Sequence, residues 1–467
     1  MRKHRGAEEV THGGQRHPRL AAPGAGGREP PERSGVPVAN IPVTDIPVTN
    51  IFVLGLDEQN CATLSALPGA EQYRFHQLLR RDELVKEGIE WDNALAAAQS
   101  RLDGFDGSVD AVVGYWDFPV SSLVPVLCAR RGLPCASLEA VLKCEHKYWS
   151  RLEQRRSIDE HPRFGLVELD DRQPPDGVGY PLWLKPVKAF SSALAFRVHD
   201  DGQFRAALET IRARIGGIGG AFDAALRHAE VPDEVAEAGG QACLAEEAVS
   251  GNQVTVEGYD DGSQFRIYGV IDSHNYEGSP SFERYQYPSS LPRELTDRLA
   301  EISRRVIRRI GLRSVFNIEY FWDPGSGEVH LLEINPRHSQ SHARLFEQVD
   351  GVPNHKCMVE MGLGRTPEFP HRQGRYAVAA KWFHRRFEDA TVVRAPTAED
   401  VARVEREIPG VAVEIAAPRG VRLSDMPEQD SYSYNLAVVH VAASDEQELH
   451  RKYSDCIRSL PFEFAAA

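Results

Sequence analysis

Two glutamates near residue 320 have the type and the spacing of a metal-binding pair. The run VFNIEYFW at 315–322 is rich in β-branched and aromatic residues, the five residues DPGSG supply turn chemistry, and a second apolar run follows at 329–334. This pattern predicts a β-hairpin. With that turn, Trp322 would face Glu328 and Glu319 would pair with Leu331. Glu319 would then lie diagonally across from Glu333, with roughly 7–8 Å between the backbones.

The hairpin would gather Glu319, Glu333 and the neighbouring Asn335, and two carboxylates on a half-buried sheet repel each other unless a cation joins them. Oxygen ligands of this kind suit Mg²⁺, which usually binds one or two carboxylates together with substrate phosphates. Arg337 would add a fork-shaped donor suited to a phosphate oxygen. The alternative is a surface hairpin with solvated glutamates. Glu333 lies inside the apolar run LLEIN, where an unpaired charge is costly, and this favours the metal site.

Lysines earlier in the chain have the positions expected of phosphate contacts. Lys185 lies at the end of an apolar run and is followed by a polar loop with Ser191 and Ser192, whose backbone N–H groups could cradle a phosphate. Lys147 and Arg151 have i, i+4 spacing on one face of a helical stretch. Taken singly, these motifs are more often solvated basic residues.

Two acidic residues, Glu246 and Glu247, end the strand-like run CLAEEAV and are followed by a turn at 250–252. A carboxylate with free backbone groups at a strand end could read an adenine edge, and Gln253 could reach the ribose. The alternative is a pair of glutamates at the mouth of a loop.

The elements that must position these residues follow from the hydrophobic pattern. Strands alternating with helices predict a small open parallel sheet in the N-terminal third, and a 3.6-residue apolar stripe at 293–312 predicts an amphipathic helix before the hairpin. The glycine-rich stretch at 216–220 is interpreted as a linker. The predicted segments are a disordered extension at 1–48, an α/β domain at 49–138, two subdomains at 139–240 and 241–370, and an α+β module at 371–467.

Composition excludes several classes of protein. The formal charge of −14 disfavours nucleic acid or an anionic membrane as a partner. No apolar run approaches the roughly 18 residues of a membrane span. The cysteines are odd in number, dispersed and without a CxxC pair, which is typical of reduced thiols in a cytoplasmic protein.

The order of these motifs over roughly 50–370 resembles the ATP-grasp superfamily, and the most specific part of the resemblance is Glu319 with the string EINPR. It implies an α/β and α+β ATP-grasp fold with a Rossmann-like pre-ATP-grasp domain, in which the nucleotide lies between two subdomains. It also implies ATP and Mg²⁺, or Mn²⁺, as cofactors. The implied phosphate contacts are Lys147, Lys185, Ser191 and Ser192; the implied adenine contacts are Glu246 and the backbone of Ala248 and Val249. The implied metal ligands are Glu319, Glu333 and Asn335, with Arg337 stabilising an acyl phosphate.

The C-terminal module resembles the lid region of the bacterial L-amino-acid ligases, which also carry a glycine-poor phosphate loop of the type KAFSS. The run PRHSQSH departs from the patterns of biotin carboxylases and D-Ala–D-Ala ligases. The implied function is an ATP-dependent carboxylate–amine ligase acting on small molecules, and dimers are common in the family. The alternatives are a carboxylase-like or thiol-acylating enzyme and a non-catalytic nucleotide-binding regulator.

The residues that choose the substrate have a weaker signal. The stretch 275–290 combines aromatic and polar residues and is interpreted as a substrate-covering loop, in which Glu283 and Arg284 would grip amino-acid charges. The run HSQSH at 338–342, with Ser339 and Ser341, would line the same cavity. Ordinary surface-loop behaviour is the alternative for both stretches.

Overall fold

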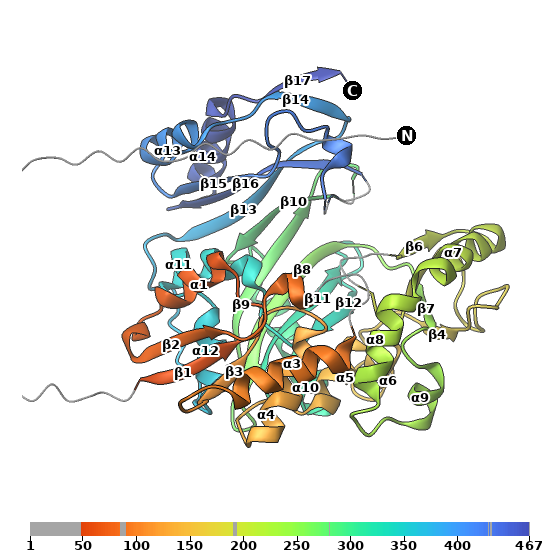
Figure 1. The fold of residues 1–467 in the computed structure, drawn as a ribbon. Coiled ribbons are helices and arrows are strands. Elements are labelled where there is room, and N and C mark those ends of the chain that lie inside the picture. Colours follow the sequence, from red (N-terminus) through yellow and green to blue (C-terminus); the bar gives the residue numbers. More distant parts are fainter. Residues whose placement is uncertain are drawn as a thin grey trace, which may run out of the picture. The chain divides into compact units, whose positions relative to one another are not determined.

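The computed structural model describes residues 48–84, 90–189, 194–279, 281–427, 429 and 432–466 (Figure 1). Ser191 and Ser192 of the expected phosphate loop lie outside these residues, and so does the predicted N-terminal extension up to residue 47. In the described part of the chain the strands form sheets of eight, four, three and two strands. Over the same residues, no helix combines the length and the apolar character needed to span a bilayer.

The N-terminal third folds as the predicted parallel sheet, with strand order β2-β1-β3. In β1 and β3, the apolar residues Ile51, Val53 and Val113 are fully or nearly fully buried. The elements here are β1 (Thr49–Val53), α1 (Glu58–Ser65), η1 (Ala70–Gln72), β2 (Tyr73–Gln77), α2 (Arg81–Leu84), α3 (Trp91–Asp103), β3 (Ala111–Val113) and α4 (Val120–Arg131).

The next segment builds an antiparallel four-stranded sheet of order β4-β7-β5-β6, with α7 packed on β5 and β6. Two short helices precede this sheet and carry several of the predicted site residues. The elements are α5 (Leu138–Glu145), α6 (Lys147–Arg155), β4 (Phe164–Val167), β5 (Leu182–Pro186), β6 (Phe196–Val198), α7 (Asp201–Arg214), α8 (Gly216–Leu226), α9 (Asp233–Ala238) and β7 (Cys243–Glu247).

The prediction of a glycine-rich linker at 216–220 is wrong, because this stretch begins helix α8. Phe222 and Ala225 are fully buried in the core that α8 shares with α3. Gly219 packs so closely on the chain that an added Cβ would lie 2.9 Å from the carbonyl oxygen of Gly240. Close packing of small residues therefore overrides the low helix propensity of glycine.

The eight-stranded sheet has the order β12-β11-β8-β9-β10-β13-β16-β15 and continues through the predicted boundary at 370. The amphipathic helix predicted at 293–312 is present as α10, and its apolar stripe packs on one face of the sheet. The elements up to residue 370 are β8 (Asn252–Asp260), β9 (Phe265–Asn275), β10 (Phe282–Tyr287), α10 (Arg293–Ile310), β11 (Val315–Trp322), β12 (Val329–Asn335), η2 (Gln340–His342), α11 (Ala343–Asp350) and α12 (His355–Gly362).

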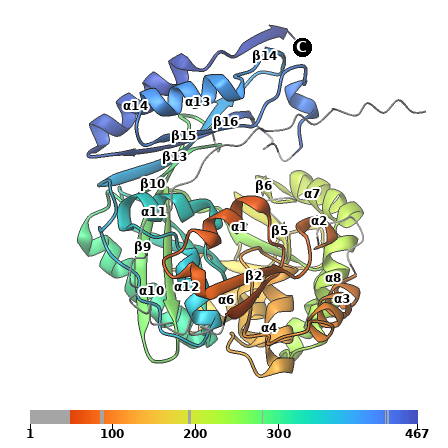
Figure 2. The ribbon, with the colours of Figure 1, turned by 60° about the vertical axis from the view of Figure 1, so that its left-hand side comes forward.

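The C-terminal segment adds β13, β16 and β15 to this sheet, and α13 and α14 cover them on one face (Figure 2). Its core includes Trp382, Val439 and Leu449, all fully buried. Its elements are β13 (Val378–Arg386), β14 (Ala390–Arg394), α13 (Ala398–Glu407), β15 (Val411–Ile415), η3 (Leu423–Asp425), β16 (Tyr434–Ala443), α14 (Glu446–Ser459) and β17 (Glu463–Ala466). Because one sheet spans both sides of residue 370, the domain limits remain a prediction.

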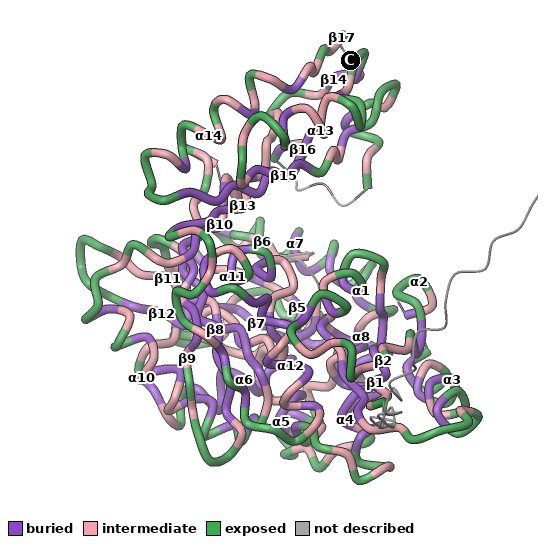
Figure 3. The backbone as a smooth tube through the Cα atoms, turned by 90° about the vertical axis from the view of Figure 1, so that its left-hand side faces the viewer, coloured by how far each residue is buried: buried purple, intermediate pink, exposed green. Residues whose placement is uncertain are grey.

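The two faces of the eight-stranded sheet differ in chemistry. Figure 3 shows that buried residues concentrate along the strands, and exposed residues concentrate at hairpin ends and on outer helix turns. One face carries the apolar side chains that meet α10, α13 and α14. The other face carries polar residues in direct cross-strand register, named the polar row below: Gln253, Ser273, Tyr285, Lys381 and His440.

Candidate active site

The two predicted metal carboxylates face each other directly on neighbouring strands. The predicted register is wrong: Trp322 pairs with Val329, Tyr320 with Leu331, and Glu319 with Glu333. The register shifts between Glu319 and Tyr320, so Leu332 is an extra residue on β12. A bulge of this kind redirects side chains and is frequent beside active sites. It converts the expected diagonal into a directly opposed pair, and Asn317 opposes Asn335 next to it.

Arg151 of α6 holds the bulge in place. Its guanidinium donates to the carbonyl oxygen of Leu331 at 2.9 Å and to that of Leu332 at 2.8 Å. Its Nε donates to Glu246 Oε1 at 2.6 Å, and the side chain is 2% exposed. The sequence indicated only a basic helical face here; the structure identifies Arg151 as the clamp that joins α6, β7 and the bulged strand.

Glu319 is a carboxylate without a cationic partner among the described residues. Gln253 Nε2 donates to Glu319 Oε2 at 2.9 Å, and no ion pair to Glu319 occurs in the described part of the chain. Burial, followed by repulsion from Glu333, raises the pKa of Glu319 to about 7. A cation bound beside this half-buried carboxylate would stabilise its ionised form.

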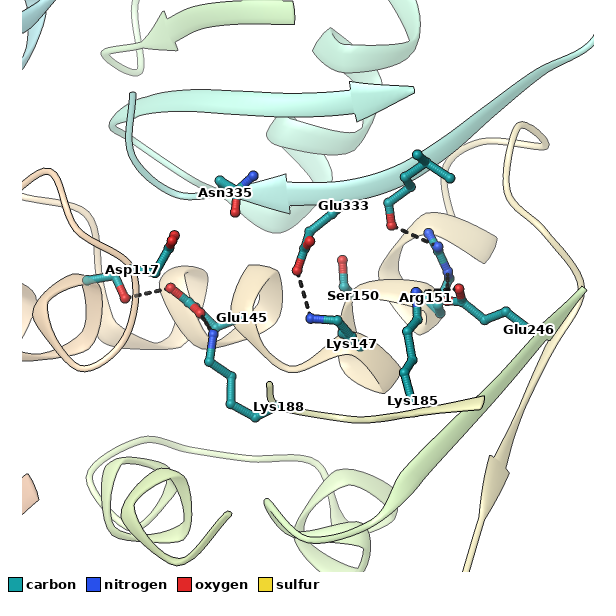
Figure 4. Close-up of polar contacts among 12 residues, drawn as sticks. Asp117, Glu145, Lys147, Ser150, Arg151, Lys185, Lys188, Glu246, Glu333 and Asn335 are labelled. Atoms are coloured by element: carbon teal, nitrogen blue, oxygen red, sulfur yellow. Dashed lines mark hydrogen bonds and ion pairs between the residues drawn. The ribbon is translucent and has the colours of Figure 1, made fainter. Parts of the chain in front are cut away.

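Glu333 lies opposite the helix that carries Lys147 (Figure 4). The Lys147 ammonium donates to Glu333 Oε1 at 2.7 Å. Although burial opposes ionisation, the attraction of Lys147 lowers the pKa of Glu333 to about 2. Burial would lower the pKa of Lys147, but the pairing with Glu333 outweighs it and the pKa is raised. The predicted phosphate lysine and the predicted metal ligand are thus brought into contact.

Lys185 and Glu246 form a second buried ion pair, with Lys185 Nζ 2.6 Å from Glu246 Oε2. Burial opposes ionisation of Glu246, but Arg151 and Lys185 together lower its pKa to about 2. Burial lowers the pKa of Lys185, and the cations Arg151 and Lys147 add to this effect. Glu246 therefore pairs with two cations here, and its expected role at the adenine edge stays a prediction.

The other residues expected around the base also have partners within the protein. The backbone N–H groups of Ala248 and Val249 donate to the carbonyl oxygens of Pro181 and Glu247, at 3.2 and 3.0 Å. Glu247 pairs with Arg163 at 2.8 Å on the surface. Gln253, expected near the ribose, is the residue whose amide holds Glu319. An adenine contact through these backbone N–H groups would require exchange of the hydrogen bonds that they make here.

Three charged residues beside the site were not predicted from the sequence: Lys188, Glu145 and Asp117. Lys188 is buried and paired with the carboxylate of Glu145 on α5, with the ring of Phe118 5.7 Å from its ammonium. Arg337 donates through Nε to Asp117 Oδ1 at 2.7 Å, so the N-terminal domain contributes a carboxylate here. Lys188 stands only three positions after Lys185, and a second lysine beside a strand-end lysine could have signalled it.

Asn335 is oriented by a hydrogen-bond chain that begins at the fully buried Glu257. Glu257 accepts from Asn317 Nδ2 at 3.3 Å, and Asn317 Oδ1 accepts from Asn335 Nδ2 at 3.2 Å. Glu257 also accepts from His342 Nδ1 at 2.7 Å and from Asn354 Nδ2 at 2.9 Å. This network leaves the amide oxygen of Asn335 as the atom available to a ligand.

The middle of the predicted substrate loop at 275–290 is strand β10 at 282–287, so this part of the stretch is not a loop. Its apolar and aromatic residues pair with β9 and β13 inside the sheet. Arg284 lies against Trp382, 5.6 Å from the ring, and pairs with Glu283 at 2.8 Å. These two residues are therefore not brought to the carboxylate pair. Tyr285, between Arg284 and Gln286, faces the other way and lies 5.1 Å from the ring of His342.

The 338–342 segment is in contact with the C-terminal module. Ser341 Oγ accepts from Lys381 Nζ at 2.6 Å, and the backbone N–H of Ser339 donates to Glu257 at 3.3 Å. Lys381 has no ion pair among the described residues, and burial lowers its pKa to about 8. No sequence pattern indicated Lys381, because only the sheet pairing brings β13 next to β10.

The residues present fit a divalent cation bound together with phosphates. Glu319 and Glu333 are directly opposed, Asn335 offers an amide oxygen, and Glu319 has no ion-pair partner among the described residues. No group of three or more acidic, histidine or cysteine ligands converges anywhere in the described ranges. This agrees with Mg²⁺ sites that rely on one or two carboxylates, water and substrate phosphates.

Comparison with known sequences agrees with this geometry. Residues 178–343 match the family model described as "ATP-grasp domain". The large chain of carbamoyl phosphate synthase from Clostridium acetobutylicum is 29% identical over 127 residues, which cover 26% of this chain and 12% of that protein. The chain therefore matches only a small part of the length of this relative.

Comparison with solved structures extends the similarity to nearly the whole fold. The L-amino acid ligase from Bacillus licheniformis has a TM-score of 0.65 at 13% identity, over 89% of this chain and 99% of that one. The biotin carboxylase domain of the Hydrogenobacter thermophilus 2-oxoglutarate carboxylase has a TM-score of 0.59 at 14% identity, over 89% and 91%; it was solved as a dimer with MgADP, ADP and bicarbonate. At such identities the likeness concerns the fold alone.

Proposed function

From the premise that this chain carries an ATP-grasp domain within an ATP-grasp fold, we propose that it is an ATP-dependent carboxylate–amine ligase. The reaction would transfer the γ-phosphoryl group of ATP to a substrate carboxylate, and an amine would then displace phosphate. The observation that carries this proposal is the opposed pair Glu319 and Glu333, faced by Lys147 and flanked by Arg337. The substrates we favour are amino acids or similar small molecules, and no macromolecular substrate is required.

The roles of the residues follow from their charges. Glu319, Glu333 and Asn335 would hold Mg²⁺, which supplies neutralisation of phosphate charge when bound. Lys147 and Lys185, released from their glutamates, would contact phosphate oxygens. Arg337 would stabilise the charge that develops on the activated carboxylate. Phosphoryl transfer needs chiefly positioning and charge neutralisation, so no nucleophilic side chain is required.

The test is phosphate release by the purified chain with ATP, Mg²⁺ and a panel of amino acids, with mass spectrometry of the products. Glu333→Gln should lower turnover by more than the 10–100-fold typical of losing an outer-shell partner, because it removes a direct ligand. Glu328→Gln, which changes an exposed glutamate of the same hairpin, is the matched control and should leave turnover unchanged. Full turnover of Glu333→Gln would remove the hairpin from the mechanism.

Two rival functions make different predictions. A carboxylase-like enzyme would release phosphate only with bicarbonate, and a thiol-acylating enzyme only with a thiol in place of the amine. A nucleotide-binding regulator would bind Mg·ATP and release no phosphate with any acceptor. Glu319 makes no ion pair among the described residues, and this favours an enzyme of the ligase type, since its carboxylate remains available to a catalytic metal.

A further inference from the structure

A cavity of about 470 Å³ lies between helix α11 and the strands β13, β16 and β15. None of the residues assigned above to the nucleotide or the metal lines it. Its walls combine apolar side chains with basic and amide groups: Arg344, Leu345, Glu347, Gln348, Gly351, Arg375, Tyr376, Ala379, Ala380, Gly410, Val411, Ala412, His440 and Val441.

His440, the last member of the polar row, is 8% exposed and lines this cavity. Neither of its ring nitrogens has a hydrogen-bond partner among the described residues, and the nearest carboxylate oxygen, on Glu414, lies 3.9 Å from Nδ1. Burial lowers the pKa of His440 well below its usual value, and the cations Lys381 and Arg344 add to the effect. A buried imidazole without a partner is costly, and a ligand in the cavity would relieve this cost.

Two arginines give the cavity a positive wall. Arg344, in the first turn of α11, makes no hydrogen bond or ion pair within the described ranges. Arg375 stacks on Tyr376, 5.4 Å from the ring, which leaves its guanidinium N–H groups for other partners. Glu347 is the acidic residue of the lining, so the basic side chains outnumber it.

We propose that this cavity binds a small organic anion, a carboxylate or phosphate group on a short apolar body. Arg344 forms the ion pair, His440 donates a hydrogen bond, and Leu345 with Val411 packs on the apolar part. The site lies at the far end of the polar row from the carboxylate pair. His440 pairs with Lys381, and Lys381 donates to Ser341 in the segment that follows Arg337, so the anion site has a direct structural connection to the candidate active site.

The test follows the imidazole ¹³C–¹H signals of the full-length chain, with saturating Mg·ADP present so that the nucleotide site is occupied. Inorganic phosphate and butyrate are titrated separately, with sodium chloride at equal ionic strength as the reference. The His440 signal, assigned with His440→Gln, should move saturably while the remaining histidines provide the internal control. Arg344→Gln should weaken the response about ten-fold or more, since a hydrogen bond to a charged group is lost. Arg419→Gln changes an exposed arginine that forms no ion pair in the described part of the chain, and it should leave the response unchanged.

The separate titrations with phosphate and butyrate distinguish which class of anion the cavity binds. A response to phosphate alone identifies a phosphorylated ligand, a response to butyrate alone identifies a carboxylate, and a response to both identifies a general oxyanion site. An unmoved His440 signal, an equal response to chloride, or wild-type binding by Arg344→Gln overturns the proposal. The readout needs no turnover, so failure of the ligase proposal would leave this result interpretable.

Discussion

At the scale of single residues, the site is defined by charges whose partners are incomplete. Glu319 has a raised pKa and Lys381 a lowered one, each mainly because of burial. Glu246 and Glu333, by contrast, are held ionised by neighbouring cations. Glu319 and Lys381 therefore lack an ion-pair partner among the described residues, and we expect ligands of opposite charge to bind beside them.

The metal-free chain should lose stability as pH rises through the range set by Glu319. Its folded pKa of about 7 lies above the ordinary value of 4.5, so between these values the folded state binds more protons than the unfolded state. The stability contribution is thus full below about pH 4.5 and is lost by about pH 7. The free energy of unfolding can be measured by urea unfolding without metal at pH 5.5 and at pH 8. Its decrease between these pH values should be larger by about 1–2 kcal/mol in the wild type than in Glu319→Gln. An equal loss in both proteins would contradict the assignment.

Lys381 should produce the opposite trend at higher pH. Its folded pKa is about 8, below the ordinary 10.5, so between these values the unfolded state binds more protons and stability rises with pH. The difference in unfolding free energy between wild type and Lys381→Met should therefore shift in favour of the wild type from pH 7.5 to 9.5. Lys452→Met is the control, because Lys452 lies in the same module and pairs with Glu448 at 3.2 Å. The difference in unfolding free energy between wild type and this variant should not shift in this way between the two pH values.

At the scale of elements, the irregular pairing of the two hairpin strands is what places the two glutamates opposite each other. The extra residue on β12 brings Glu333 directly opposite Glu319, and the carbonyl groups at the bulge accept hydrogen bonds from Arg151 of α6. The helix that carries Lys147 thus also fixes the strand that carries Glu333. Under the proposed function, this couples the positions of the two groups that would meet the same phosphate.

Arg151→Lys should break this coupling while keeping the charge. Lysine lacks the planar fork that reaches the two bulge carbonyls and Glu246 together, so a destabilisation of about 2 kcal/mol or more is expected. The KM for Mg·ATP should rise as well. Arg155→Lys, on the same helix but stacked on Phe164 at 5.3 Å, is the control and should change neither quantity. A variant that loses stability but keeps its KM would limit Arg151 to a structural role.

At the scale of the molecule, the C-terminal segment continues the sheet that the strands β8 to β12 begin. β13 pairs with β10 over the whole contact from Arg284–Trp382 to Tyr287–Ala379. The polar row crosses this junction through Tyr285 and Lys381. The segment is therefore part of one sheet, which explains how a residue beyond 370 reaches the loop that follows Arg337.

A chain truncated after residue 370 should not fold as a stable, active fragment. It would expose the edge of β10 and the buried Arg284, and unpaired edges of this kind promote aggregation. We expect it to be insoluble or to unfold well below the full-length chain in a thermal melt. A soluble fragment with the full-length melting temperature would show that the C-terminal segment is an independent domain.

The sequence by itself determined the local chemistry and the local elements. The hairpin, the amphipathic helix α10, the parallel N-terminal sheet and the types of residue at the metal site follow from turn signals and hydrophobic period. It also placed Glu319, Glu333, Asn335 and Lys147 in one site, and the structure brings them together.

Only the tertiary structure decided the geometry that depends on distant contacts. The bulge at Leu332 is stabilised by Arg151, far away in the chain, so no local pattern could reveal it. The helix at 216–226 forms because Gly219 packs on Gly240. The stretch at 282–287 becomes a central strand because β13 is available to pair with it. In each case the deciding energy comes from partners separated in sequence, and local propensity contains no information about them.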